Sequence, residues 1–187
     1  MKKIIAAILV LGVCTPVFAA GEIQKTGGVM LGYGMPGSDL GDIVDGGIGF
    51  GLDFDGYKVN DMWSVGASFI YTTGSGEIAS IADYDISTMG LTPYAKYSKE
   101  VDLGGKKFTA FGLAGVGFYS VNVETTGTGI FNGINTDESE TEFGFNLGGG
   151  LMYPINDKMQ VGADIRYHLV ASNLSYFIPA AKFTYSF

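Results

Sequence analysis

The sequence predicts an all-β fold, an eight-stranded antiparallel up-and-down transmembrane β-barrel. Three observations support this prediction: eight segments alternate between apolar and small or polar residues, the apolar face is the bulkier one, and long and short connections alternate. The composition agrees, because the chain is 47% hydrophobic and only 16% charged, with 30 Gly, 11 Tyr and 13 Phe. A disordered chain is poor in aromatic residues and rich in charge, so this composition excludes disorder.

The first 19 residues have the pattern of a secretory signal peptide. Lys2 and Lys3 are followed by an apolar stretch from Ile4 to Val13, and small residues precede a cleavage site after Ala19. This stretch is too short to span a bilayer. We expect residues 1–19 to be removed and residues 20–187 to form the barrel. Cys14 is the only cysteine, so disulfides and thiolate metal sites are excluded from the exported chain.

Eight segments of the remaining chain have the period of two that is typical of a β-strand with one apolar face. No apolar run among them approaches the roughly 20 residues that a membrane-spanning helix needs. In the fifth and least regular segment, the residues expected on the outward face are Phe111, Leu113, Tyr119 and Val121. The eight segments cover residues 28–34, 47–55, 63–72, 88–97, 108–121, 143–153, 159–169 and 177–187.

The sizes of the two faces indicate which one points into the barrel. In the second segment Phe50, Leu52 and Phe54 share one face, whereas Gly51 and Asp53 share the other. The interior of a small barrel has room for small and polar groups but not for large side chains from every strand. The apolar face therefore points outward, which is the membrane arrangement. Closure follows, because an open sheet edge cannot face lipid.

The connections between the segments differ in length and in charge. Long connections at 36–46, 74–86, 122–141 and 171–175 alternate with short ones at 57–61, 99–106 and 154–158. Outer-membrane barrels have long external loops and short periplasmic turns. The first three long connections hold acidic residues, and none of the four holds Lys or Arg. This acidic balance argues against nucleic-acid binding. Positive charges gather at the short connections, in Lys58, Lys99, Lys106, Lys107 and Lys158.

Several charged or titratable residues fall on the inward faces of the segments. Charges inside a narrow barrel must be paired, because an unpaired buried charge costs several kcal/mol. The pattern predicts an interior network that plugs the lumen, with a gate or pore lining as the functional alternative. The predicted network comprises Asp53, Asp55, Asp164, Arg166, Lys182 and His168.

The residues predict no catalytic, cofactor or metal site. His168 is the only histidine, and the nearest following hydroxyl, Ser172, is four residues away rather than the two seen in lipid A deacylase-like barrels. The densest acidic stretch lacks the spaced ligands and turn glycine of an EF-hand loop, so it would bind Ca²⁺ or Mg²⁺ weakly, and simple solvation is the alternative. Its carboxylates are Asp137, Glu138, Glu140 and Glu142.

The end of the chain carries a resemblance to a known family. Phe183, Tyr185 and Phe187 alternate up to the last residue, which resembles the assembly signal that the barrel-insertion machinery recognises in outer-membrane proteins. The glycine-rich segments at 111–119 and 143–150 look like those of the OmpA/OmpX-type eight-stranded barrel family. The resemblance covers the whole exported chain and implies an outer-membrane location. We expect the barrel domain alone, without the peptidoglycan-binding domain that follows it in full OmpA proteins.

We therefore expect a monomeric outer-membrane barrel with a structural or surface-interaction role, in adhesion or envelope integrity. Its acidic external loops would contact lipopolysaccharide or the outside world, and the barrel would contact outer-membrane lipid. One alternative is a narrow pore or hydrophobic-ligand channel, and another is a lipid-modifying barrel enzyme. A soluble lipocalin-like barrel and a count of ten strands also stay open.

Overall fold

The computed structural model describes residues 22–37, 44–78, 82–127, 135–170 and 174–187. These residues form eight strands, and none of them forms a helix long and apolar enough to cross a membrane. The strands are β1 (Glu22–Pro36), β2 (Asp45–Lys58), β3 (Trp63–Ile78), β4 (Ala82–Leu103), β5 (Lys106–Gly127), β6 (Asn135–Pro154), β7 (Met159–Val170) and β8 (Ser175–Ser186).

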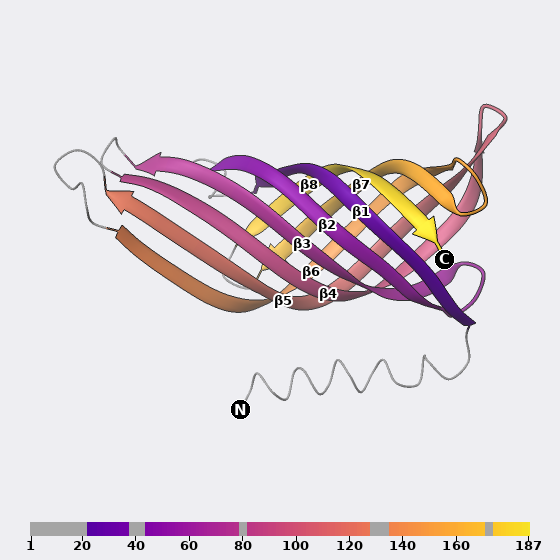
Figure 1. Cartoon of the computed structure of the whole chain (residues 1–187), viewed down its shortest axis with the longest axis horizontal. Coiled ribbons are helices and arrows are strands. Elements are labelled where there is room, and N and C mark those ends of the chain that lie inside the picture. Colours follow the sequence, from indigo (N-terminus) through magenta and orange to yellow (C-terminus); the bar gives the residue numbers. More distant parts are fainter. Residues whose placement is uncertain (1–21, 38–43, 79–81, 128–134, 171–173) are drawn as a thin grey trace.

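The eight strands close into a single barrel (Figure 1). Each strand is antiparallel to the next, and β1 pairs with β8 through register partners such as Val29 and Phe183. The predicted eight-stranded up-and-down barrel is confirmed, and the count of ten is wrong. We call the end at which β1, β3, β5 and β7 terminate the loop end. The other, which holds the end of β8 and the short connections, is the turn end.

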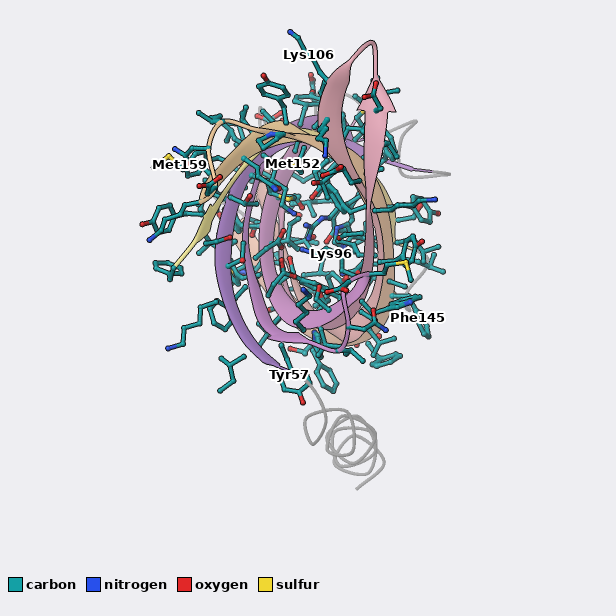
Figure 2. All side chains as sticks on the ribbon, turned by 90° about the vertical axis from the view of Figure 1, so that its right-hand side faces the viewer. Tyr57, Lys96, Lys106, Phe145, Met152 and Met159 are labelled. Carbon is teal, nitrogen blue, oxygen red and sulfur yellow. The ribbon has the colours of Figure 1, made fainter. Side chains whose placement is uncertain are left out.

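The apolar face points outward, as predicted. Leu31, Ile48 and Leu147 are each about 60% exposed, although they are large aliphatic residues in the middle of strands. Figure 2 looks along the barrel from the turn end and shows Phe145 pointing away from the ring, with Lys96 and Met152 inside it. An apolar surface this extensive is stable only against lipid.

The predicted orientation of the fifth strand is wrong. Phe111, Leu113 and Tyr119 were expected to face outward, but they are at most 9% exposed and lie inside the barrel. Both faces of β5 are apolar, so alternation alone does not choose between them. Neighbouring glycines decide, because a Cβ at Gly90 or Gly144 would lie within 2.7 Å of the Tyr119 ring. Val121 lies on the same inward side and packs against the interior.

Two of the predicted long connections, 74–86 and 122–141, are mostly strand. β4 pairs with β5 as far as Ala82 and Gly127, and β5 pairs with β6 as far as Thr126 and Asn135. By contrast, β6 pairs with β7 only as far as Gly144. Strands β3–β6 therefore reach past the other four at the left of Figure 1. We call this extension, residues 76–78, 82–86, 122–127 and 135–143, the projecting sheet.

The predicted short connection at 99–106 is also mostly strand. β4 and β5 pair up to Leu103 and Lys106, and only two glycines join them. Gly104 and Gly105 have φ values of 65° and 78°, which is the left-handed region that a tight two-residue hairpin turn requires. β3 pairs with β4 only as far as Tyr97, so the tip of this hairpin extends beyond the barrel at the upper right of Figure 1.

The interior holds two clusters of large apolar side chains. The sequence did not predict them, because the inward faces of the segments were expected to hold mainly small and polar residues. One cluster includes Tyr119 and Val170 toward the loop end, and the other includes Phe111 and Met152 toward the turn end. Along β7 the charged residues lie between them, because Met152 pairs with Gly162 and Val170 follows the charged residues. The lumen is therefore layered: apolar, ionic and apolar.

Candidate functional site

The centre of the lumen is occupied by four charged side chains from three strands. Asp53 extends from β2, Asp164 and Arg166 from β7, and Lys182 from β8, each on the inward face that the alternation assigns to it. Their exposed fractions run from 0% to 7%, so all four are buried. We call this group the ion cluster.

Arg166 is the hub of the ion cluster. Its guanidinium donates to both oxygens of Asp53, at 3.0 and 2.5 Å, and to both oxygens of Asp164, at 3.2 and 2.9 Å. A fifth hydrogen bond, of 2.7 Å, goes from Arg166 Nη1 to Ser68 Oγ. The planar guanidinium matches two carboxylates in this way, whereas an ammonium acts as a point charge.

Lys182 completes the cluster and balances its charge. Its Nζ donates to Asp53 Oδ2 at 2.5 Å and to Asp164 Oδ2 at 2.9 Å. The two cations and two carboxylates leave no net charge, and each polar atom has a partner. Such a group is stable when complete, because removing any one member leaves an unpaired buried charge.

Asp55 belongs to a separate ion pair nearer the turn end. Lys96 Nζ donates to its Oδ2, and Tyr94 Oη donates to its Oδ1 at 2.8 Å. Lys96 was not among the residues predicted to form the interior network. The alternation of residues 88–97 was the available signal, because it places Lys96 on the same face as Thr88, Thr92 and Tyr94.

His168 lies inside the lumen but outside the ion cluster. Its Nδ1 is hydrogen-bonded to Tyr119 Oη at 2.9 Å, and its ring stacks on Tyr176 with centroids 4.7 Å apart. Its Nε2 and the Tyr176 hydroxyl have no partner among the described residues. The side chain is fully buried, so it has no access to lipid outside the barrel.

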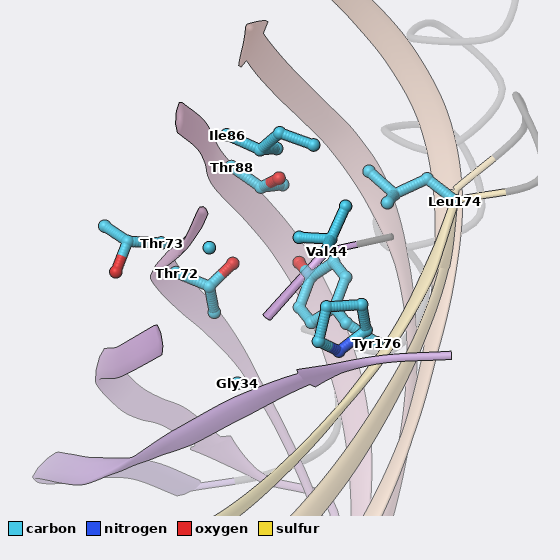
Figure 3. Close-up of a pocket in the computed structure, with 10 residues that line it drawn as sticks. Gly34, Val44, Thr72, Thr73, Ile86, Thr88, Leu174 and Tyr176 are labelled. Atoms are coloured by element: carbon cyan, nitrogen blue, oxygen red, sulfur yellow. The ribbon is translucent and has the colours of Figure 1, made fainter. Parts of the chain in front are cut away.

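The two cavities at the ends of the lumen share no lining residue. At the loop end Thr72, Thr88 and Tyr176 line a cavity of about 30 Å³ (Figure 3). At the turn end a polar cavity of about 210 Å³ is lined by residues that include Asp55 and Lys182. The ion cluster and the apolar layers thus lie between one vestibule and the other.

The projecting sheet carries the acidic residues that were predicted to form a loop. Asp137, Glu138, Glu140 and Glu142 follow one another along β6, and consecutive residues such as Asp137 and Glu138 point to opposite faces. Glu138, Glu140 and Glu142 therefore follow one another in a row on one face, and Asp137 lies on the other. In the described part of the chain, no group of three His, Cys, Asp or Glu side chains is placed to hold a metal ion.

The model of one protein family, described as outer membrane protein beta-barrel domain, matches residues 5–187. The chain belongs to this family. Outer-membrane barrels have short periplasmic turns and longer external loops, so we expect the projecting sheet to extend outside the cell and the β4–β5 hairpin to lie on the periplasmic side. No curated protein matches the chain.

Solved structures of other outer-membrane barrels are similar to this one. The attachment invasion locus protein Ail of Yersinia pestis is 18% identical with a TM-score of 0.53, covering 88% of this chain and 100% of its own. Neisserial surface protein A is 16% identical with a TM-score of 0.56, covering 90% and 99%. OprG of Pseudomonas aeruginosa is 14% identical with a TM-score of 0.55, covering 89% and 98%. At these identities the likeness shows the fold alone.

Two further predictions concern the ends of this outer-membrane protein. Phe183 and Phe187 lie on the outward face, 37% and 75% exposed, and Phe187 contacts Tyr185 with centroids 5.0 Å apart. Their recognition by the assembly machinery stays a prediction. The signal peptide at residues 1–19 lies outside the described residues, and its cleavage after Ala19 also stays a prediction.

Proposed function

We propose that this protein is a sealed outer-membrane barrel that acts at the cell surface through its projecting sheet. The observation that carries the proposal is the ion cluster. Arg166 and Lys182 bind Asp53 and Asp164 across the lumen, and Lys96 binds Asp55. Among the described residues, these charged groups inside the barrel are therefore all paired. The parts left to carry a function are those that extend outside the membrane.

The projecting sheet has two properties of a binding surface. It is anionic, because it carries carboxylates such as those of Glu138, Glu140 and Glu142, and the sequence has no Lys or Arg in residues 59–95 or 108–157 to balance them. Within the described ranges its edge is open, because residues 135–143 of β6 pair with β5 and have no register partner on β7. An unpaired strand edge offers backbone hydrogen bonds to an extended segment of another chain. The partner we propose is a cationic surface or segment outside the cell.

Adhesion of cells that display the protein tests this function directly. The variant E138Q/E140Q/E142Q removes three carboxylates from the sheet edge and keeps the shape of each side chain. We expect severalfold weaker, less salt-dependent adhesion to a polylysine-coated surface, because screened charge attraction supplies the contact. The matched control is D61N/D102N/D157N in the periplasmic turns. Equal adhesion of both variants and the parent would contradict the proposal.

We propose that the barrel has no lipid-modifying activity. This rests on His168, whose ring is buried within the lumen between Tyr119 and Tyr176. A hydrolase acting on a membrane lipid needs its histidine within reach of the scissile bond. We expect the lipid A mass spectrum of cells expressing H168A to equal that of cells expressing the parent. A modification that depends on His168 would make the protein an enzyme.

A further inference from the structure

Three lysines lie on the outward face of the barrel at its turn end, directly beside the aromatic side chains that end the lipid-facing band. All three are exposed. The sequence has no Lys or Arg in residues 26–57, 59–95 or 108–157. These residues therefore place no cationic side chain at the loop end of the lipid-facing surface. We call this set the lysine belt: Lys25 on β1, Lys99 on β4 and Lys106 on β5.

Lys106 lies against aromatic side chains on the outward face. Its Nζ lies 6.0 Å from the centroid of the Tyr153 ring, and Tyr153 packs on Phe108 with centroids 5.4 Å apart. Tyr153 is 40% exposed on the lipid-facing side. In Figure 2 Lys106 extends outside the ring of strands, in contrast to Lys96 within it.

Lys99 lies on the same outward face of the β4–β5 hairpin. It comes two residues after Tyr97, whose ring packs against Trp63 with centroids 5.3 Å apart. Leu103 continues this face toward the tip and is 50% exposed. The hairpin thus extends the lipid-facing band with apolar and cationic side chains together.

Lys25 lies at the turn end of β1, where β1 pairs with β8. Its carbonyl accepts a 2.9 Å hydrogen bond from the backbone N–H of Phe187. Ile23 and Phe187 beside it are 76% and 75% exposed, so the apolar band continues here as well. Thr26, the next residue, is buried and faces the lumen, which places Lys25 on the outside.

The belt lysines are not neutralised by the protein. Within the part of the chain that the structure describes, no salt bridge joins Lys25, Lys99 or Lys106 to a carboxylate. Lys107 is different, because its Nζ lies 2.8 Å from Glu100 Oε1 on the opposite face of the hairpin. The hydrogen bond and charge of Glu100 raise the pKa of Lys107 above its usual value.

Aromatic belts lie at the level of the lipid headgroups, so an unpaired ammonium beside them lies at the level of the lipid phosphates. The long lysine stem covers apolar surface while its charged end reaches the headgroup. We propose that the lysine belt binds the phosphate groups of anionic phospholipids in the periplasmic leaflet. The site is continuous with the lipid contact of the barrel and complementary to these lipids in charge.

Native mass spectrometry of the refolded full-length exported chain tests the proposal. The protein is mixed with phosphatidylglycerol or with phosphatidylcholine, and retained lipids are counted. We expect the parent to retain phosphatidylglycerol preferentially. K106Q should weaken this retention about fivefold, and K25Q/K99Q/K106Q about a hundredfold, which corresponds to about 1 kcal/mol for each lysine at a membrane surface.

K107Q is the matched control, because it removes the adjacent charge on the other face of the same hairpin and should leave retention unchanged. Gel mobility with and without heating verifies that each variant is folded. Equal loss in K106Q and K107Q, or no preference in the parent, would overturn the proposal. Inorganic phosphate is the second probe. If it competes with the lipid at equal concentration, the belt binds free phosphate and the lipid assignment is wrong.

Discussion

At the scale of residues, the lumen shows why a barrel interior tolerates charge only in complete sets. Arg166 contacts two carboxylates that are themselves shared with Lys182, so every charge has partners of opposite sign. The space for them comes from glycine. A Cβ at Gly148 would lie 3.1 Å from Arg166 Cγ and 3.1 Å from the carbonyl oxygen of Ile165, which is tighter than side chains normally approach.

Removing the hub of the cluster should destabilise the barrel. R166M leaves Asp53 and Asp164 with one cation between them, and breaking a buried ion pair in this way costs about 3–5 kcal/mol. The measurement is the free energy of unfolding in urea, from lipid vesicles. D53N/R166M removes one charge of each sign, so its free energy of unfolding should fall less than that of R166M. A loss in D53N/R166M equal to the sum of the losses in D53N and R166M would mean that the two side chains are not coupled.

At the scale of elements, β5 and the projecting sheet depart from the predictions for related reasons. β5 is apolar on both faces, so its local pattern does not identify the inward one. The strands of the projecting sheet are polar on much of their surface, so they lack the apolar alternation that marks a strand. In both cases a neighbouring strand decides the structure. Gly90 on β4 leaves the space that Tyr119 occupies, and the residues of the projecting sheet are strand because each has a register partner on the next strand.

The inward orientation of Tyr119 makes Gly90 sensitive to substitution. In G90A the added Cβ would lie 2.6 Å from the Tyr119 ring, which has no free space to move into. We expect a loss of about 1–3 kcal/mol in unfolding free energy, the usual cost of overpacking. The control is G112A on the outward face, where the nearest atom lies 3.9 Å from the added Cβ. Similar losses in both variants would argue that Tyr119 does not face inward.

At the scale of the whole molecule, charge is distributed along the barrel axis. Carboxylates dominate the external end, an ion cluster neutral in itself crosses the centre, and exposed lysines lie at the periplasmic end. This separation is the basis of the two partners proposed above, a cationic surface for the external end and anionic lipid for the periplasmic end. It also interrupts the polar path through the lumen, since the apolar cluster toward the loop end lies between the ion cluster and the loop-end cavity, whereas the turn-end cavity reaches Lys182.

A sealed lumen predicts that the folded barrel does not conduct. In a planar bilayer the refolded protein should give no steady current steps, because the ion cluster and the apolar layers separate the two vestibules. Heat-modifiable gel mobility of the same sample verifies folding. Steady steps from the folded protein would make the narrow pore the leading function, and D53N/R166M would then be expected to change their size.

The sequence by itself determined the all-β class, the eight strands, the outward apolar face and the inward position of the charged residues. These follow from alternation, which is a property of neighbouring residues. Only the tertiary structure decided that Arg166 binds Asp53, 113 residues away, that Asp55 pairs with Lys96, and how far β3–β6 extend. The physical reason is that these contacts depend on the stagger between strands and on the space that facing glycines leave, and neither is encoded within a single segment.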